Sequence, residues 1–431
     1  MTESKPNETT PPTLTLDLLQ QAVRGNAAAI RQVSRLEPAG DPGDKVFPPT
    51  YQGGVYATET RRINGQDVKC VLLDSVQSQA NRMEQALLAA CNETIDGARR
   101  LEMPLLAVEF NDFPDIGRIT ALDAPHRIAD AIFRDSELGG VKFRETADGR
   151  AFEAANLRSA TALFRLCPTA LIFGTWDSTG EASFGNKFAR AIVSEIVGMN
   201  ATIGVHTSSR IDPLVPTGCS IFQDVNGDWT VNEVLAIRDE QGNPVPFKRK
   251  PKHKGKISEI NLGNVTPSIE QDEKTKEHLR GGATIDYAQQ TTVLSLAALR
   301  RLQFPNGTEV ASSERNHAAR TVLAALGLVA ITLQREQGYF LRSRCDLIPS
   351  DDDVTFEIVH SAKTKLRHTL TAAQAIALLN QAVAVATGEA IGLEWPTEAV
   401  PLQPSQKLLA LVRKSRESGV ADEEEGNDVL S

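Results

Sequence analysis

The sequence lacks the features of several protein classes. Its 431 residues include only five cysteines, widely scattered and without a C-x-x-C pair, so neither a disulfide framework nor a structural zinc site is expected. No stretch approaches the roughly 18 uninterrupted apolar residues of a membrane span, because even the most apolar one, 318–333, is broken by Arg320 and two threonines. The N-terminal residues lack a secretory pattern, and we therefore expect a cytoplasmic protein.

The usual catalytic signatures are missing as well. The sequence contains no G-x-x-x-x-G-K-[ST], no H-E-x-x-H, no G-x-S-x-G, and no G-x-G-x-x-G after a predicted strand. Aromatic residues make up only 5% of the chain, so a platform for stacking bases is not evident. The sequence therefore predicts no catalytic residue, no metal site and no cofactor.

The composition is that of an average globular protein with an excess of acidic over basic residues. Hydrophobic residues make up 41% and charged residues 23% of the chain, and its length predicts two to three domains or one large domain with insertions. The formal net charge is −9, which repels polyanions at long range. Any binding of nucleic acid must therefore come from a local concentration of cations.

The predicted helices and strands do not alternate regularly, which favours an α+β fold. The acidic end, 421–431, is predicted to be a disordered tail. Helical spacing is found within 13–36, 78–91, 126–134, 156–166, 186–199, 294–302, 318–333 and 371–386, strands are predicted over 55–60, 68–73, 104–110, 168–174, 339–345 and 354–359, and a hairpin is predicted within 141–152.

Two segments place cations beside predicted strands. Ser208, Ser209 and Arg210 follow a short strand and offer two hydroxyls and a guanidinium to a phosphate, although Arg210 can instead brace a turn by pairing with Asp212. The range 339–345 alternates like a strand, and it would place Arg342 and Arg344 on one face, as a phosphate track or as a solvated face.

The only strong basic run is 247–256, which holds six lysines and arginines among ten residues and no acid. Proline and glycine break it, so we place it on an excursion from the main fold. It either contacts phosphates, through residues such as Lys248, Arg249 and Lys250, or serves only to solubilise the chain.

Two further segments allow a catalytic and a structural interpretation. Asp177 follows an apolar run, where its carboxylate can act as a base or metal ligand, or cap a turn. His126 and Asp130 could form a general-base pair with Arg127 as a cationic stabiliser, or stand at the start of a helix as ordinary neighbours four residues apart.

Several segments occur in an order that resembles one known family. They are LDSVQSQANRME (73–84), HRIAD (126–130), FRDS (133–136), ALIFGTWDS (170–178), KFARAIVSEIVG (187–198), SSRIDP (208–213) and LSLAALRRL (294–302). Together they resemble the RAMP-type backbone subunit of the Cas-seven superfamily, found in the CRISPR type I-U/I-G Cascade interference complex. The similarity spans about residues 45 to 350.

The resemblance implies a modified ferredoxin-like or RRM-like palm with finger and thumb insertions. Such subunits do not catalyse; copies polymerise head to tail in a helical filament along one CRISPR RNA and present it for pairing with the target DNA strand in antiviral defence. Further partners are the large subunit and a Cas-five/Cas-six-like cap subunit, with no membrane. Within the chain we expect an RRM-like palm with helical insertions (45–221), a basic hairpin excursion (222–285) and the remainder of the palm (286–390). The N-terminal helix and entry loop (1–44) and the C-terminal segment with the acidic tail (391–431) lie outside the resemblance.

The RNA-binding residues follow from the matching segments and from the cationic residues described above. The set is Asn81, Arg82, His126, Arg127, Arg134, Arg158, Lys187, Arg190, Ser208, Ser209, Arg210, Lys248, Arg249, Lys250, Arg342 and Arg344. The alternative is a metal-dependent ribonuclease, since related RNA-targeting complexes cut target RNA with a loop aspartate, for which Asp177 or Asp212 would serve here.

Overall fold

The computed structural model describes residues 11–177, 187–214, 218–249, 255–271, 278, 280–307, 309–350, 354–360 and 365–425, with side chains up to residue 417. It forms two compact units. The first consists of Met1–Pro42, Leu72–Asn200 and Asp286–Ser431, and the second of Gly43–Val71 and Ala201–Ile285.

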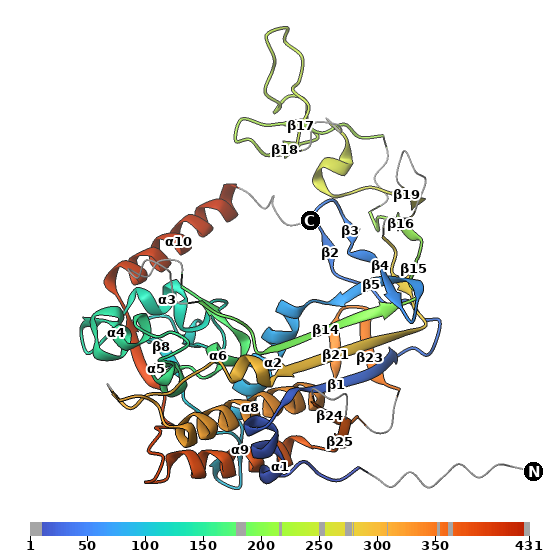
Figure 1. Ribbon diagram of the computed structural model, residues 1–431. Helices are drawn as coiled ribbons and strands as arrows, with labels where there is room; N and C mark the ends of the chain where they lie inside the picture. Colours follow the sequence, from blue (N-terminus) through green and yellow to red (C-terminus); the bar gives the residue numbers. More distant parts are fainter. Residues whose placement is uncertain are drawn as a thin grey trace, which may run out of the picture. The chain divides into compact units, whose positions relative to one another are not determined.

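An antiparallel sheet lies at the centre of the first unit (Figure 1). Its strands are β1 (Ala27–Pro38), β14 (Ile192–Met199), β21 (Tyr287–Ser295), β22 (Tyr339–Arg342), β23 (Cys345–Pro349), β24 (Phe356–His360) and β25 (Lys365–His368). β1 pairs with β21 on one side and with β23 and β24 on the other. Its side chains alternate as a strand requires, because Ile30 and Leu36 are buried while Val33 and Arg35 are exposed.

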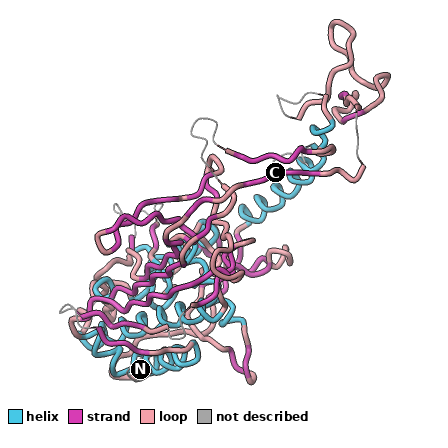
Figure 2. The backbone as a smooth tube through the Cα atoms, turned by 90° about the vertical axis from the view of Figure 1, so that its right-hand side faces the viewer, coloured by secondary structure: helices cyan, strands magenta, loops and turns pink. Residues whose placement is uncertain are grey.

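Helices pack on the buried side of this sheet; Figure 2 shows the strands in magenta and the helices in cyan. They are α1 (Leu16–Arg24), α2 (Val76–Asn92), α8 (Ser313–Glu336) and α9 (Ala372–Thr387). Each begins after a hydroxyl side chain that accepts a backbone N–H, and Thr371 and Gln374 form a capping box at α9. α8 is long and apolar enough to cross a membrane, but an 18-residue apolar window of it is 83% buried inside the protein.

A second, five-stranded sheet lies in the same unit, in the order β11-β10-β26-β8-β9. Its strands are β8 (Leu106–Phe110), β9 (Gly117–Thr120), β10 (Ser136–Leu138), β11 (Val141–Lys142) and β26 (Val400–Pro404). Phenylalanines fill the core around it, with Phe133, Phe143 and Phe152 fully buried. Short elements complete the unit: β6 (Thr94–Ile95), β7 (Ala98–Arg99), η1 (Arg127–Ala129), α3 (Ala131–Arg134), η2 (Phe143–Glu145), α4 (Ala147–Glu153), α5 (Thr161–Leu166), α6 (Thr169–Phe173), β12 (Thr175–Trp176), β13 (Lys187–Phe188), α7 (Leu296–Leu299) and α10 (Gln406–Glu425).

The second unit is built mainly from two-stranded pieces. Its elements are β2 (Thr50–Tyr51), β3 (Val55–Tyr56), β4 (Thr58–Ile63), most of β5 (Gln66–Asp74), β15 (Thr202–Ile203), β16 (His206–Arg210), β17 (Phe222–Gln223), β18 (Trp229–Thr230), η3 (Ile257–Ile260), β19 (Val265–Glu270) and β20 (Ala283–Thr284). The hydroxyl of Tyr56 accepts the backbone N–H groups of Gly281 and Gly282, and this ties two distant segments of the unit together.

The α+β class is confirmed, but several predicted elements are wrong. The range 168–174, predicted as a strand, contains helix α6, and 186–199, predicted as a helix, contains strands β13 and β14. β14 is buried along most of its length, so its apolar residues do not show the alternation of a half-exposed strand. The predicted hairpin within 141–152 is instead the short strand β11 followed by η2 and α4.

Two other expectations change in part. The predicted strand 339–345 is the hairpin β22–β23, with Arg344 in its turn at a φ of 58°. Arg342 and Arg344 therefore do not share the face of one strand, and the predicted two-cation track on that strand is wrong. The predicted acidic tail begins as helix, since α10 reaches Glu425, and its remainder, 426–431, lies outside the described residues.

Candidate nucleic-acid interface

A groove of about 560 Å³ opens beside the N-terminal half of α2 in the first unit. Its walls come from α2, from the segment around η1, and from the hairpin β12–β13. Five of the predicted RNA-binding residues line it, although they come from three separate segments of the sequence: Asn81, His126, Arg127, Lys187 and Arg190. The structure thus brings together residues that are up to about a hundred positions apart in the chain.

Arg127 is the buried cation of this groove. Its guanidinium pairs with the carboxylate of Glu84 through two hydrogen bonds of 2.6 and 2.7 Å, and it donates a third, of 2.9 Å, to the carbonyl of Gly174. Both side chains of the pair are less than a tenth exposed. Burial raises the pKa of Glu84 to about 7, although Arg127 and Arg190 act to lower it.

Lys187 and Arg190 are the exposed cations of the groove. Among the described residues, no carboxylate lies within ion-pair distance of either side chain. Partial burial of its guanidinium, and after it the neighbouring Arg127, lower the pKa of Arg190, while Glu84 acts to raise it. Arg190 also packs its stem against Gly174, where a Cβ atom would approach it to 3.0 Å.

Asn81 and Gln77 add uncharged hydrogen-bonding groups to the groove. They are four residues apart on α2 and both exposed, so they face the same side of the helix. His126 lines the groove from the segment before η1 and is exposed, and its backbone N–H donates to Asp130. Asp130 also accepts the backbone N–H of Ile132 at the start of α3, so His126 and Asp130 are neighbours at the start of a helix, which is the structural alternative that the sequence left open.

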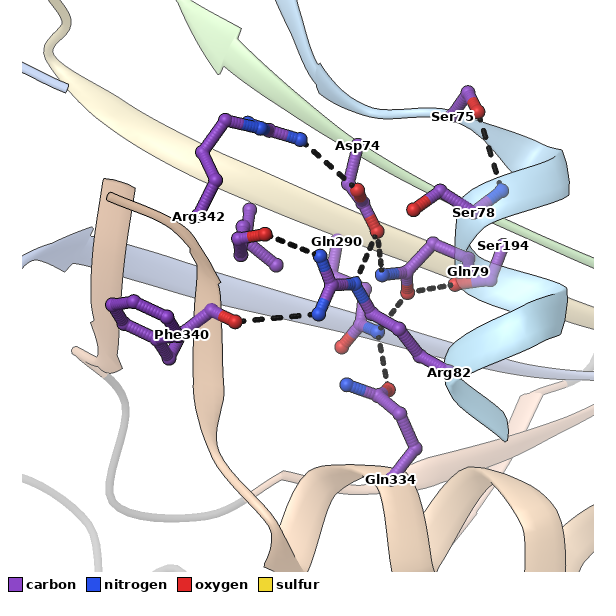
Figure 3. A network of polar contacts seen from close by, with 11 residues as sticks. Asp74, Ser75, Ser78, Gln79, Arg82, Ser194, Gln290, Gln334, Phe340 and Arg342 are labelled. Carbon is purple, nitrogen blue, oxygen red and sulfur yellow. Dashed lines mark hydrogen bonds and ion pairs between the residues drawn. The ribbon is translucent and has the colours of Figure 1, made fainter. Parts of the chain in front are cut away.

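Arg82 of α2 and Arg342 of β22 both contact the buried carboxylate of Asp74, the last residue of β5 (Figure 3). Arg82 lies 2.9 Å and Arg342 3.3 Å from its two oxygens, and Gln79 donates to it at 2.6 Å. Arg82 also donates to the carbonyls of Phe340 and Leu341. These contacts join α2 to β22, so the two guanidiniums have a structural role, while about a quarter of each side chain stays exposed.

A layer of glutamines continues this cluster beneath the sheet (Figure 3). The amide of Gln290 donates to Gln79 at 2.8 Å and to Gln334 at 3.0 Å. Tyr339 donates to Gln290 at 2.9 Å, and burial raises the pKa of its hydroxyl to about 12. The layer fixes the N-terminal half of α2, which carries both the groove residues and Arg82.

The other predicted residues of the first unit do not line the groove. Arg134 pairs with its neighbour Asp135 at 2.7 Å. Arg158 is exposed in the segment before α5, and Arg344 is exposed in the turn between β22 and β23.

The remaining predicted residues belong to the second unit. Ser208, Ser209 and Arg210 are exposed on β16, where Ser208 shares a hydrogen bond with Ser268 and Arg210 pairs with Asp212 at 2.8 Å. Lys248 and Arg249 are exposed as well, and Lys250 lies outside the described residues.

The two aspartates proposed for the alternative function are both engaged by arginine. Asp177 is buried and lies 2.6 Å from Arg144. Asp212 is buried and accepts the backbone N–H groups of Leu214 and Gly263 as well as the Arg210 guanidinium; although burial acts to raise its pKa, these donors hold it below the usual range. Within the described part of the chain, no group of three or more histidines, cysteines or acids is placed to hold a metal ion.

Two residues of the groove were missed by the sequence analysis. Trp176 is 62% exposed, and the sequence was interpreted there only for its neighbour Asp177. Gln77 lies one helical turn before Asn81 and carries no signal of its own in the sequence.

Residues 30–203 match the family described as CRISPR-associated protein GSU0053. No curated protein matches the chain. The family match covers the segments that build the groove and confirms the predicted resemblance to a CRISPR-associated, RAMP-type family, although it ends well before residue 350, to which the resemblance was expected to extend.

Proposed function

From a match to a CRISPR-associated, RAMP-type family over residues 30–203, we propose that this protein is a backbone subunit that binds CRISPR RNA in the groove beside α2. The match supports a role in CRISPR interference and participation in a CRISPR complex. We further propose that the complex is the type I-U/I-G Cascade complex, and that its other members are the partners given above. We also propose that the protein acts in the cytoplasm.

The observation that carries the proposal is the excess of positive charge in the groove. Glu84 balances only Arg127, which leaves the cations of Lys187 and Arg190 exposed on a chain whose net charge is −9. Phosphates supply the opposite charge at regular intervals, and contacts to them need no particular base sequence. A guide that is read by base pairing calls for this kind of grip.

The fold is consistent with the proposed palm and its insertions. The antiparallel sheet of the first unit has helices on one side, as an RRM-like palm would, and we assign the palm to this unit. The two-stranded pieces of the second unit interrupt its sequence twice and suit the insertions. Copies that track a linear RNA need a head-to-tail contact that does not close into a ring.

We propose a non-catalytic role for the same protein. Asp177 and Asp212 are both buried and paired with arginines, so neither carboxylate has a face open to a hydrated magnesium ion. The bidentate ion pair of Arg127 and Glu84 and the helix caps described above make the site rigid, as a scaffold that holds RNA in place requires.

The test begins with the full chain as purified from cells. We expect a high ratio of absorbance at 260 to 280 nm and co-purified RNA of uniform length. The double variant Lys187→Glu and Arg190→Glu should lose this RNA, while Lys414→Glu, an exposed charge reversal on α10, should keep it. A wild-type protein that carries no RNA and binds no single-stranded RNA at low salt would contradict the proposal.

A further inference from the structure

Trp176 presents its indole to solvent inside the groove, which is an unusual position for this residue. Its side chain is 62% exposed, whereas the groove's phenylalanines, Phe173 and Phe188, are buried. Tryptophan carries more apolar surface than any other side chain, and a folded protein normally covers most of it. An exposed indole in a groove that also holds cations indicates a ligand with both a flat apolar face and negative charge.

The hairpin β12–β13 fixes the direction of the indole. Thr175 pairs with Phe188, and Trp176 pairs with Lys187. Thr175 and Phe188 are buried, so the alternation along each strand turns Trp176 and Lys187 to the other side, together. The Lys187 ammonium lies 5.8 Å from the centre of the indole ring.

We propose that Trp176 stacks on a nucleobase of the bound RNA while Lys187 contacts an adjacent phosphate. The proposal rests on the proposed function and makes it more specific, because it assigns to the groove a contact to the base in addition to the contacts to the backbone. Stacking on an aromatic side chain tolerates every base, since each has a π-face. It therefore suits a protein that must hold guides of any sequence.

The surroundings of the indole are consistent with a base. Asn81 and Gln77 present exposed amides on the α2 wall, and these can donate to or accept from the edge of a base. Lys187 and Arg190 stand on the hairpin wall, where a backbone phosphate would find them. The groove thus offers a different kind of contact to each part of a nucleotide.

The experiment compares two ligands on the full chain after bound RNA has been removed at high salt. One is a single-stranded RNA, and the other is a ribose-phosphate oligomer of the same length without bases. Wild-type protein should bind the RNA about tenfold more tightly than the baseless oligomer, as expected from the stacking of one base. Trp176→Leu should lose most of this preference for RNA, because leucine keeps apolar contact without a π-face.

Two further measurements separate stacking from a change in fold or charge. Trp176→Phe should retain most of the affinity for RNA but lose the quenching of tryptophan fluorescence that RNA causes in the wild type. Trp176→Leu should keep the wild-type melting temperature and salt dependence, since the residue is exposed and uncharged.

The outcomes distinguish this inference from the proposed function. If wild-type protein binds neither ligand at low salt, both are wrong. If it binds both ligands equally, or if Trp176→Leu discriminates between them as the wild type does, the RNA-binding function stands and the stacking role of Trp176 is overturned.

Discussion

Arg127, which lines the groove, and Glu84 form a bidentate ion pair with bonds of 2.6 and 2.7 Å, and both side chains are almost fully buried. Arg127 is the first residue of η1 and adopts a φ of 54°. The pair connects the segment before α3 to α2, and so it holds two walls of the groove together. Arg127 is therefore a structural residue of the site as well as a cation within it.

The first prediction concerns the pH dependence of stability. The pKa of Glu84 is about 7 in the folded protein and about 4.5 in the unfolded chain, so the folded state binds this proton more tightly. The stability contributed by Glu84 is complete below pH 4.5 and is lost as the pH rises through 7. Relative to wild type, Glu84→Gln should gain about 3 kcal/mol in unfolding free energy between pH 4.5 and 8. Urea denaturation at several pH values measures this.

The control for that prediction is Glu93→Gln, because Glu93 is an exposed member of an ion pair with Arg100. Its difference from wild type should change little over the same range. A difference between Glu84→Gln and wild type that is constant from pH 4.5 to 8 would show that Glu84 does not titrate in this range.

The second prediction concerns Arg127 itself. At pH 8, Arg127→Met leaves the Glu84 carboxylate buried without its partner, which should cost about 3–5 kcal/mol of unfolding free energy. Arg413→Met removes an exposed arginine that pairs with Asp112 and should cost less than about 1 kcal/mol. Chemical denaturation of both variants provides the comparison. An Arg127→Met protein with wild-type stability would instead leave RNA binding as the main role of this residue.

The third prediction compares Arg82 and Arg158, to which the sequence analysis assigned the same RNA-binding role. Arg82→Ala removes an ion pair with buried Asp74 and two hydrogen bonds to β22, so it should lower the melting temperature. Arg158→Ala removes an exposed side chain and should leave melting unchanged. Calorimetry measures both. If Arg82→Ala melts like wild type but binds RNA poorly, its contact with RNA outweighs its structural role.

The fourth prediction concerns salt. Each cation of the groove that neutralises a phosphate of single-stranded RNA should contribute about 0.7 to the slope of log K against log salt concentration. Lys187→Ala and Arg190→Ala should each reduce the slope by about this amount, whereas Lys414→Ala should not. Binding titrations at several salt concentrations test this, and unchanged slopes in both groove variants would place the phosphate contacts elsewhere.

The fifth prediction follows from the non-catalytic role. With magnesium present, wild-type protein loaded with guide should leave complementary RNA intact, and Asp177→Asn and Asp212→Asn should behave in the same way. Gel analysis of labelled target RNA shows the result. Cleavage at regular intervals that is lost in either aspartate variant would establish the ribonuclease alternative.

The sequence predicts the parts of the fold in which periodicity and capping agree. Helices α8 and α9 lie where their apolar spacing placed them, and Thr371 caps α9 as such residues do. Helix α6 and strand β14 were assigned the wrong structure because both are buried nearly all round. A short apolar run without a polar face carries no period that distinguishes a helix from a strand.

Part of the candidate site was predicted as well, but from the family segments and not from periodicity or capping. Lys187 and Arg190 were selected from a segment wrongly expected to be a helix, and the family segments, rather than the local structure, directed attention to them. The partners that fix Arg82 and Arg127, Asp74 and Glu84, lie 8 and 43 residues away in sequence, and no local pattern indicates such pairings. The exposure of Trp176 depends on how a two-residue strand is turned, which only the folded chain determines.

The position of α8 in the core has a consequence for synthesis of the protein. α9 packs along α8 but is made at least 35 residues later, and strand β1 likewise obtains its neighbour β24 only near the end of translation. A nascent chain that stops short of Ala372 would therefore leave the α9-facing side of a long apolar helix uncovered, although α1 and α2 can already pack on its other sides, and such an exposed surface can recruit chaperones. Shortened versions of this protein should accumulate in aggregates rather than as soluble fragments.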